Sequence, residues 1–192
     1  MIPDSNYMVL TCTPVLPTGL TQRTFHRRDA IALQPNILWR IERGVVRTLT
    51  WSESGTTTVL GYWGSGDVVG QALSRVQPYQ IECVTGVAAS YIPSHECDKV
   101  LEAIFCHTQQ TEELLSIVRQ ESVYLRLRQL LTWLAGKFGH PVEQGQSLDL
   151  QLTHQDLADT IGATRVTVTR LLAQFEHSGI IHRHRRHIIL LQ

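Results

Sequence analysis

The spacing of apolar residues changes character near Ser94. From Thr24 to about Pro93, short apolar runs alternate with turn residues, which is typical of β-strands. The predicted strands are Asp29–Leu33, Ile37–Glu42, Val45–Trp51, Thr56–Tyr62, Gln80–Thr85 and Ala88–Ile92. Several short strands at this spacing favour a small antiparallel roll or barrel. Residues 1–22 carry three prolines and are expected to be irregular.

Helical spacing begins at Ser94, which is placed to cap a helix over Glu96–Phe105. A longer helix is predicted over about Thr108–Phe138, because no proline or glycine interrupts this segment before Gly136. Its apolar positions form a seam that suits either a dimer interface or the core of the protein itself.

Two short helices are predicted next, after a strand over Leu148–Leu152. Thr153 begins a capping box ahead of the first helix, Gln155–Ile161. Thr164 can cap the second helix, which runs to about His177.

The connection between these two helices carries the strongest functional signal. Ala158 is small where the helices would cross, Gly162 tolerates the positive φ of a tight turn, and Val168 fills the gap beneath the second helix. This is the helix-turn-helix pattern of DNA-binding proteins. The outer face of the second helix presents Arg165, Val166, Thr169 and Arg170. An ordinary helical hairpin in a core has no need of two arginines on that face.

The chain ends with two apolar runs that flank a tip of arginine and histidine residues, Gly179–Leu191. We interpret this as a β-hairpin wing whose tip lies against DNA phosphates. His182, His184 and His187 offer a metal site as an alternative. That alternative is disfavoured because the neighbouring arginines repel cations and no acidic or cysteine ligand accompanies the histidines.

Composition adds a charge asymmetry to this picture. The 192 residues have a formal net charge of zero, yet residues 1–122 carry 9 Lys/Arg and 12 Asp/Glu, and residues 123–192 carry 8 and 5. The basic end suggests a polyanionic partner. No apolar run approaches the length of a membrane span, and the N-terminus lacks the pattern of a secretory signal. The scattered Cys12, Cys83, Cys97 and Cys106 form no CxxC pair, so we expect reduced thiols and a cytoplasmic protein.

Three segments resemble the CRP/FNR family of bacterial transcription regulators. They are Arg43-Gly44-Val45-Val46-Arg47, Gly66-Asp67-Val68-Val69-Gly70 and Thr164–Leu172, the last resembling the recognition helix of the cyanobacterial global nitrogen regulator. The resemblance implies an α+β fold: an N-terminal antiparallel β-roll of the cyclic-nucleotide-binding type, a long connecting helix and a C-terminal winged helix-turn-helix. The expected domains are residues 1–107, 108–139 and 140–192.

The same resemblance implies a non-enzymatic, dimeric regulator of transcription. Its partners would be double-stranded DNA, a second copy of the chain and RNA polymerase, and the DNA site would resemble GTA-N8-TAC. Arg165, Val166 and Arg170 are predicted to face base edges. The full predicted DNA-binding set is Gln155, Thr164, Arg165, Val166, Thr167, Thr169, Arg170, His184 and Arg185. Within this set, the contacts to the DNA backbone are expected mainly from Gln155, Thr167, Thr169 and Arg185.

The roll departs from the family at its ligand positions. Members that bind cyclic nucleotides have Gly-Glu and then an arginine, whereas this chain has Gly70-Gln71 and no arginine between Val76 and Val100. Nothing is therefore placed to neutralise a phosphate. The arginine with which the nitrogen regulator binds 2-oxoglutarate is also missing, and the candidates to replace it are Arg75, Arg119 and Arg126. We expect no cofactor, and an effector, if the roll has one, is not identified.

Other interpretations remain open at this point. Cys97, Cys106 and His107 form either a redox or metal site or, as we favour, buried structural thiols with a packed histidine. A cupin-like enzyme or metal-binding barrel would need a histidine cluster in the roll, which has only His26, His95 and His107. A protein-interaction adaptor with a winged helix that does not bind DNA is the third possibility, and the two outward arginines argue against it.

Overall fold

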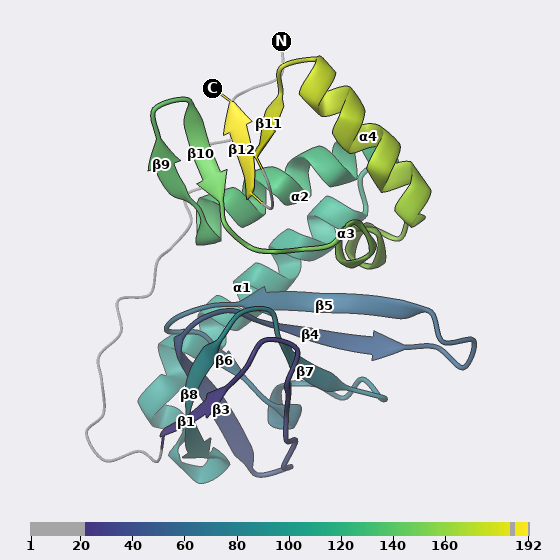
Figure 1. The fold of residues 1–192 in the computed structure, drawn as a ribbon. Helices are drawn as coiled ribbons and strands as arrows, with labels where there is room; N and C mark the ends of the chain where they lie inside the picture. The colour runs from purple at the N-terminus through teal and green to yellow at the C-terminus, as the bar shows by residue number, and fades with distance from the viewer. Residues whose placement is uncertain (1–21, 185–186, 192) are drawn as a thin grey trace.

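The structure of the protein is a computed structural model that describes residues 22–184 and 187–191, excluding the side chain of His184. Figure 1 shows two layers joined by a long helix: a β-roll, and above it a group of helices with a small sheet. The fold is α+β with antiparallel sheets in the roll, as the sequence predicts. No helix in the described part of the chain is long and apolar enough to cross a membrane.

The roll consists of two four-stranded antiparallel sheets that face each other. One sheet has the order β1 (Gln22–Phe25), β8 (Val87–Pro93), β3 (Ile37–Arg43) and β6 (Val68–Val69). The other has the order β2 (Ala30–Ile31), β7 (Gln80–Cys83), β4 (Val46–Trp51) and β5 (Thr57–Trp63). Side chains from both sheets share one apolar core, in which Ile41, Val46 and Ile81 are fully buried.

Two strands of the roll are absent from the sequence prediction. β6 has only two residues, which is too short for an alternating pattern to be visible. β1 is largely exposed and pairs with β8 at an edge, so its side chains do not alternate between core and solvent.

The segment Glu96–Phe105 is helical, as predicted, but the prediction that Ser94 caps it is wrong. The segment Ser94–Val100 forms a 3-10 helix (η2), and its N-cap residue makes no side-chain hydrogen bond. A second 3-10 helix, η1 (Gln71–Leu73), follows β6. The α-helix α1 (Leu101–Val118) begins only after η2 and crosses between the two layers in Figure 1.

The prediction of one continuous helix over Thr108–Phe138 is also wrong. α1 ends at Val118, and α2 begins at Val123 and ends at Phe138. Between them lies the polar run 119–122, in which the hydroxyl of Ser122 accepts a hydrogen bond from the Leu125 amide at 3.2 Å and caps α2. Hydroxyl caps of this kind favour a helix start over helix continuation.

The upper layer contains α2, α3 (His154–Ile161), α4 (Arg165–His177) and a four-stranded sheet. The sheet has the order β11 (Ile181–His184), β12 (His187–Leu191), β10 (Gly145–Leu148) and β9 (His140–Val142). Strands β11 and β12 form the predicted wing. The predicted strand Leu148–Leu152 is wrong in its position, because the ladder of β10 with β12 ends at the pair Leu148 and Ile188. Leu150 is nevertheless buried, which explains the alternation that suggested a strand.

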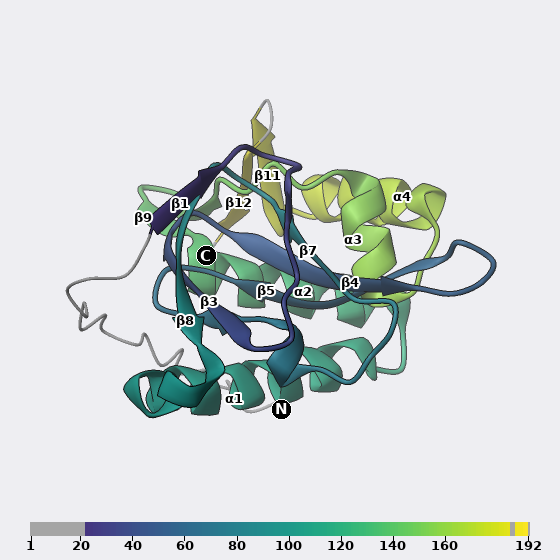
Figure 2. The same ribbon diagram turned by 90° about the horizontal axis from the view of Figure 1, so that it is seen from below.

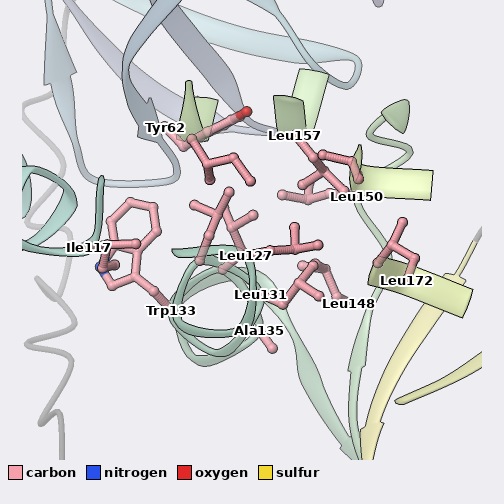
Figure 3. Packing of buried hydrophobic residues seen from close by; sticks show 14 of the residues in the cluster. Tyr62, Ile117, Leu127, Leu131, Trp133, Ala135, Leu148, Leu150, Leu157 and Leu172 are labelled. Carbon is pink, nitrogen blue, oxygen red and sulfur yellow. The ribbon is translucent and has the colours of Figure 1, made fainter. Parts of the chain in front are cut away.

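The roll and the upper layer share a second apolar core, shown in Figure 3. Tyr62 of β5 and Leu157 of α3 belong to this core, and Leu127 and Leu131 of α2 occupy its middle. Leu127 and Leu131 are almost completely buried. Seen from below in Figure 2, α3 lies over β4 and β5. The two layers are therefore packed against each other rather than joined by a bare linker.

Candidate nucleic-acid interface

The helix-turn-helix is built by the local interactions that the sequence predicts. The hydroxyl of Thr153 accepts from the Asp156 amide at 3.1 Å, and the Asp156 carboxylate accepts from the Thr153 amide at 2.7 Å, which completes a capping box. Gly162 ends α3 in the left-handed conformation, with φ of 65°. The hydroxyl of Thr164 then accepts from the Thr167 amide at 3.2 Å and begins α4.

The inner face of α4 fixes the helix in the core. Val168, Leu172 and Phe175 are fully buried, and Ala158 of α3 is fully buried where the two helices meet. Packed cores of this kind tolerate little movement. The predicted roles of Ala158, Gly162 and Val168 are confirmed by this geometry.

The outer face of α4 is open to solvent. It carries Arg165, Val166, Thr169 and Arg170, all of them exposed, and Val166 is 78% exposed. Within the described ranges, neither Arg165 nor Arg170 has an ion-pair partner. Arg183 of the wing strand β11 differs, because its guanidinium donates to Glu176 at 2.9 and 2.5 Å. The outer face of α4 therefore offers two uncommitted guanidinium groups beside a methyl-bearing side chain.

The remaining predicted contacts are less uniform. The amide of Gln155 donates to Asp159 at 2.6 Å along α3, and the hydroxyls of Thr164 and Thr167 bond to each other at 2.9 Å. These side chains form hydrogen bonds close to the starts of α3 and α4, and they are also accessible at the surface. The side chain of His184 and all of Arg185 lie outside the described residues.

His154 lies among the predicted DNA-binding residues, although the sequence did not single it out. Its Nδ1 lies 2.7 Å from the hydroxyl of Thr169, which itself donates to the Arg165 carbonyl at 2.9 Å. Burial, aided by the charges of Arg183 and Arg165, lowers the pKa of His154 below its ordinary value. His154 and Arg165 also line one surface hollow with Thr153 and Gln155. The available signal was the position of His154 directly after the Thr153 cap, where a side chain can reach the second helix.

A cavity of about 310 Å³ lies between the roll and α1. Its lining residues are Thr48, Leu60, Trp63, Leu73, Ser74, Val76, Tyr79, His107, Thr108, Thr111 and Glu112. This lining contains no lysine or arginine. Arg75, Arg119 and Arg126 do not line it, and the guanidinium of Arg126 donates instead to the carbonyls of Gln120 and Ile161. The cavity therefore offers an anion no cationic partner.

His107 is packed against an aromatic ring, and the cysteines near it differ in exposure. The His107 ring stacks on Trp63 with centroids 3.8 Å apart, and its Nδ1 lies 3.0 Å from the Val68 carbonyl. Burial lowers the pKa of His107. Cys106 is buried, but Cys97 is exposed, so the expectation of a buried thiol is wrong for Cys97. Throughout the described part of the chain, no three His, Cys, Asp or Glu side chains are grouped to hold a metal ion.

A β-roll joined by a helix to a winged helix-turn-helix defines a class of transcription regulators, and comparisons with known proteins agree. Residues 125–192 match the family model of the Crp-like helix-turn-helix domain. The regulatory protein CysR of Synechococcus elongatus is 40% identical over 167 residues, which cover 85% of this chain and 81% of CysR. The chain belongs to the CRP/FNR family of transcription regulators, as its sequence suggested, and this family is not one of enzymes.

Three further proteins are similar to this chain, one over part of its length and two over most of its length. The global nitrogen regulator of S. elongatus is 37% identical over 89 residues, which are 46% of this chain and 40% of that protein. A CRP-family regulator from Thermus thermophilus has the same fold, with a TM-score of 0.76 and 23% identity over 88% of this chain and 92% of that one. FixK2 from Bradyrhizobium japonicum has a TM-score of 0.75 and 18% identity, covering 90% and 92% of the two chains.

Proposed function

We propose that this family member binds a palindromic DNA site as a homodimer, with α4 reading base edges in the major groove. One observation carries the proposal: Arg165, Val166 and Arg170 are exposed on one face of a helix whose opposite face is buried. A recognition helix needs this combination, because its reading side chains must be free while its axis is fixed.

The proposed reading follows from the chemistry of these side chains. A guanidinium group matches O6 and N7 of guanine, so either Arg165 or Arg170 can select a G·C pair in each half-site. Val166 cannot form hydrogen bonds and favours a thymine methyl group. Similarity to the global nitrogen regulator supports a site like GTA-N8-TAC. Contacts mainly to the DNA backbone are assigned to Gln155, Thr167, Thr169 and Arg185, and Thr164 and His184 complete the proposed DNA-binding set.

The dimer interface is proposed on the outer face of α1. Leu101, Phe105 and Leu115 on this helix are 50%, 60% and 57% exposed, and their spacing follows a heptad seam. The dimer seam that the sequence suggests within Thr108–Leu134 does not contribute through Leu114, Ile117, Leu127 or Leu131, because all four are buried in the chain's own core. To read two half-sites, such a dimer must present its two copies of α4 about one DNA turn, roughly 34 Å, apart.

The proposal also covers the domain division, a protein partner, the cellular location and the effector. We retain the division into residues 1–107, 108–139 and 140–192, RNA polymerase as a partner, and action in the cytoplasm where the DNA is. The sensory roll is either degenerate or tuned to an unidentified effector. Because no lysine or arginine lines the cavity beside α1, an uncharged or cationic effector is favoured over an anionic one.

The deciding experiment compares two labelled DNA duplexes of equal length in a binding titration. One carries GTA-N8-TAC, and the other carries the same bases in scrambled order. We expect at least tenfold tighter binding to the palindrome at the same salt concentration, as specific recognition requires. Equal affinity for the two duplexes would contradict sequence-specific reading. No binding to either would favour the adaptor.

A further inference from the structure

Four charged side chains bridge the roll and the helix-turn-helix, and we call them the bridging ion cluster: Arg28, Arg47, Glu82 and Asp156. The Asp156 carboxylate lies 2.7 Å from Nη1 of Arg47 and 3.1 Å from Nη2 of Arg28. Oε1 of Glu82 lies 2.7 Å from Arg28 and 3.0 Å from Arg47. Two carboxylates thus balance two guanidinium groups.

The cluster is built into regular structure on both sides. Arg47 of β4 and Glu82 of β7 are directly opposite each other in the sheet. Arg28 has φ of 73°, the only positive φ of a non-glycine residue in the described chain, and it marks a locally strained turn. Asp156 belongs to α3, where the same carboxylate completes the capping box with Thr153. One side chain therefore both begins the first helix of the helix-turn-helix and bonds this helix to the roll.

Three of the four side chains in the cluster are shielded from solvent, whereas Arg28 is 41% exposed. The side chains of Arg47 and Asp156 are each 7% exposed, and that of Glu82 is 15% exposed. Burying charges costs free energy, so such a cluster adds little net stability compared with apolar packing. Its bonds are directional, however, and removing one partner leaves a buried charge uncompensated. A cluster of this kind fixes an orientation more effectively than it strengthens a contact.

Neighbouring polar bonds hold the same face of α3. The hydroxyls of Tyr62 and Thr160 lie 2.8 Å apart in a buried contact, and Thr160 also donates to the Asp156 carbonyl at 2.7 Å. Arg27 donates to the Gln151 carbonyl at 2.7 Å, just before α3. On its other side, α3 contacts α4 through His154 and Thr169. The connection therefore runs from β4 and β5 through α3 to the recognition helix.

We propose that Asp156 and Arg47 are positioning residues for DNA recognition: the bridging ion cluster holds the helix-turn-helix in the orientation that reads a palindrome. This inference rests on the proposed function. In the docked arrangement the reading face of α4 is exposed, so docking does not block access to DNA. A dimer must present two such faces at one spacing. If each helix-turn-helix moved freely, the fraction of dimers in that geometry would fall, and apparent affinity would fall with it.

The test uses the full chain with Asp156→Asn and Arg47→Met, alone and combined. Asparagine retains an oxygen for the Thr153 amide but removes the charge, and methionine retains most of the apolar stem of arginine. Each variant is titrated with the palindrome and with a duplex carrying a single half-site. We expect each single variant to weaken palindrome binding about tenfold or more and half-site binding less than about twofold. We expect the double variant to bind the palindrome at least as tightly as the single variant with the lower affinity, because the bonded pair is then removed as a unit.

Two matched variants keep the test decisive. Arg28→Met removes a partly exposed member of the cluster, so it tests the proposal even if the buried variants fail to fold. Lys99→Met breaks the exposed ion pair with Glu96 and should leave binding to both duplexes unchanged. Palindrome binding that is unchanged in folded cluster variants would overturn the proposal. Tighter binding would also overturn it, because the cluster would then hold an inactive orientation. If wild type fails to distinguish palindrome from scrambled DNA, the proposed function fails instead.

Discussion

The outer face of α4 and the cavity beside α1 differ in charge, and both are proposed as positions at which this regulator binds other molecules. The face of α4 presents two arginines without ion-pair partners in the described chain. The cavity is lined by hydroxyl, aromatic and apolar side chains with Glu112 as its one charged lining residue. The arginine side chains that can bind a polyanion therefore lie on the helix-turn-helix, and the cavity of the roll has no lysine or arginine in its lining.

The largest expected effect comes from separating the two copies of α4. Replacing Phe105 and Leu115 by glutamate places carboxylates on the proposed dimer seam, where they repel their copies. We expect monomers in light scattering and a loss of palindrome affinity of about 10²–10⁴-fold, because the second half-site no longer adds avidity. The variant should still unfold cooperatively, because both side chains are exposed in the single chain, but at a temperature lowered by the lost dimer contacts. A dimer that persists at micromolar concentration would place the interface elsewhere.

The next largest effect concerns the ion pair between Asp156 of the helix-turn-helix and Arg47 of the roll. Burial raises the pKa of Asp156, but hydrogen bonds from Thr153 and the charge of Arg47 outweigh burial and hold it below the ordinary value of 3.8. A lowered pKa contributes stability above the ordinary pKa, and this stability is lost as pH falls through the folded-state pKa. We expect Asp156→Asn to lower the free energy of unfolding by about 3–5 kcal/mol at pH 7.

Urea titrations of wild type and Asp156→Asn from pH 3 to pH 8 measure this difference. It should be constant between pH 5 and pH 8 and should begin to shrink below about pH 4, where the Asp156 carboxylate of the unfolded chain binds a proton before that of the folded chain. A difference that changed between pH 6 and pH 8 would point to histidine titration instead.

A smaller effect is expected at the reading face itself. Replacing Arg170 by alanine should cost about 1–3 kcal/mol per half-site and relax the preference at one base pair, since a bidentate contact to guanine is lost. Arg75→Ala, which removes an exposed cation from the roll, serves as the control and should change neither affinity nor preference. If Arg170→Ala weakens palindrome and scrambled DNA equally, Arg170 contacts phosphate rather than a base.

The smallest expected effect is an absence of binding at the cavity. Cyclic AMP and 2-oxoglutarate should leave the melting temperature unchanged, because an anion there meets Glu112 and no cation. A ligand at 100 times its Kd would stabilise the fold by about 2.7 kcal/mol, so a thermal shift assay has the required sensitivity. A Kd in the low micromolar range from calorimetry would show that the charge argument is wrong.

The parts of the fold that the sequence predicted correctly are those fixed by neighbours in the chain. Thr153 with Asp156, Gly162, and Thr164 with Thr167 act within a few residues of one another, so the helix-turn-helix and its exposed arginines could be identified without coordinates. The roll and the wing followed from apolar runs separated by turns.

The tertiary structure determined those features for which the spacing of apolar residues along the chain is compatible with more than one structure. The apolar seam after Thr108 is compatible with one helix or two, and only packing showed that Leu127 faces the chain's own core while Leu115 stays exposed. Leu150 has the alternation of a strand but is buried without a ladder. Asp156 completes a capping box, and its bond to Arg28 crosses 128 residues of sequence. The capping box is determined by the sequence over three residues, whereas the bond to the roll exists only because the fold buries both partners together, where opposite charges must pair.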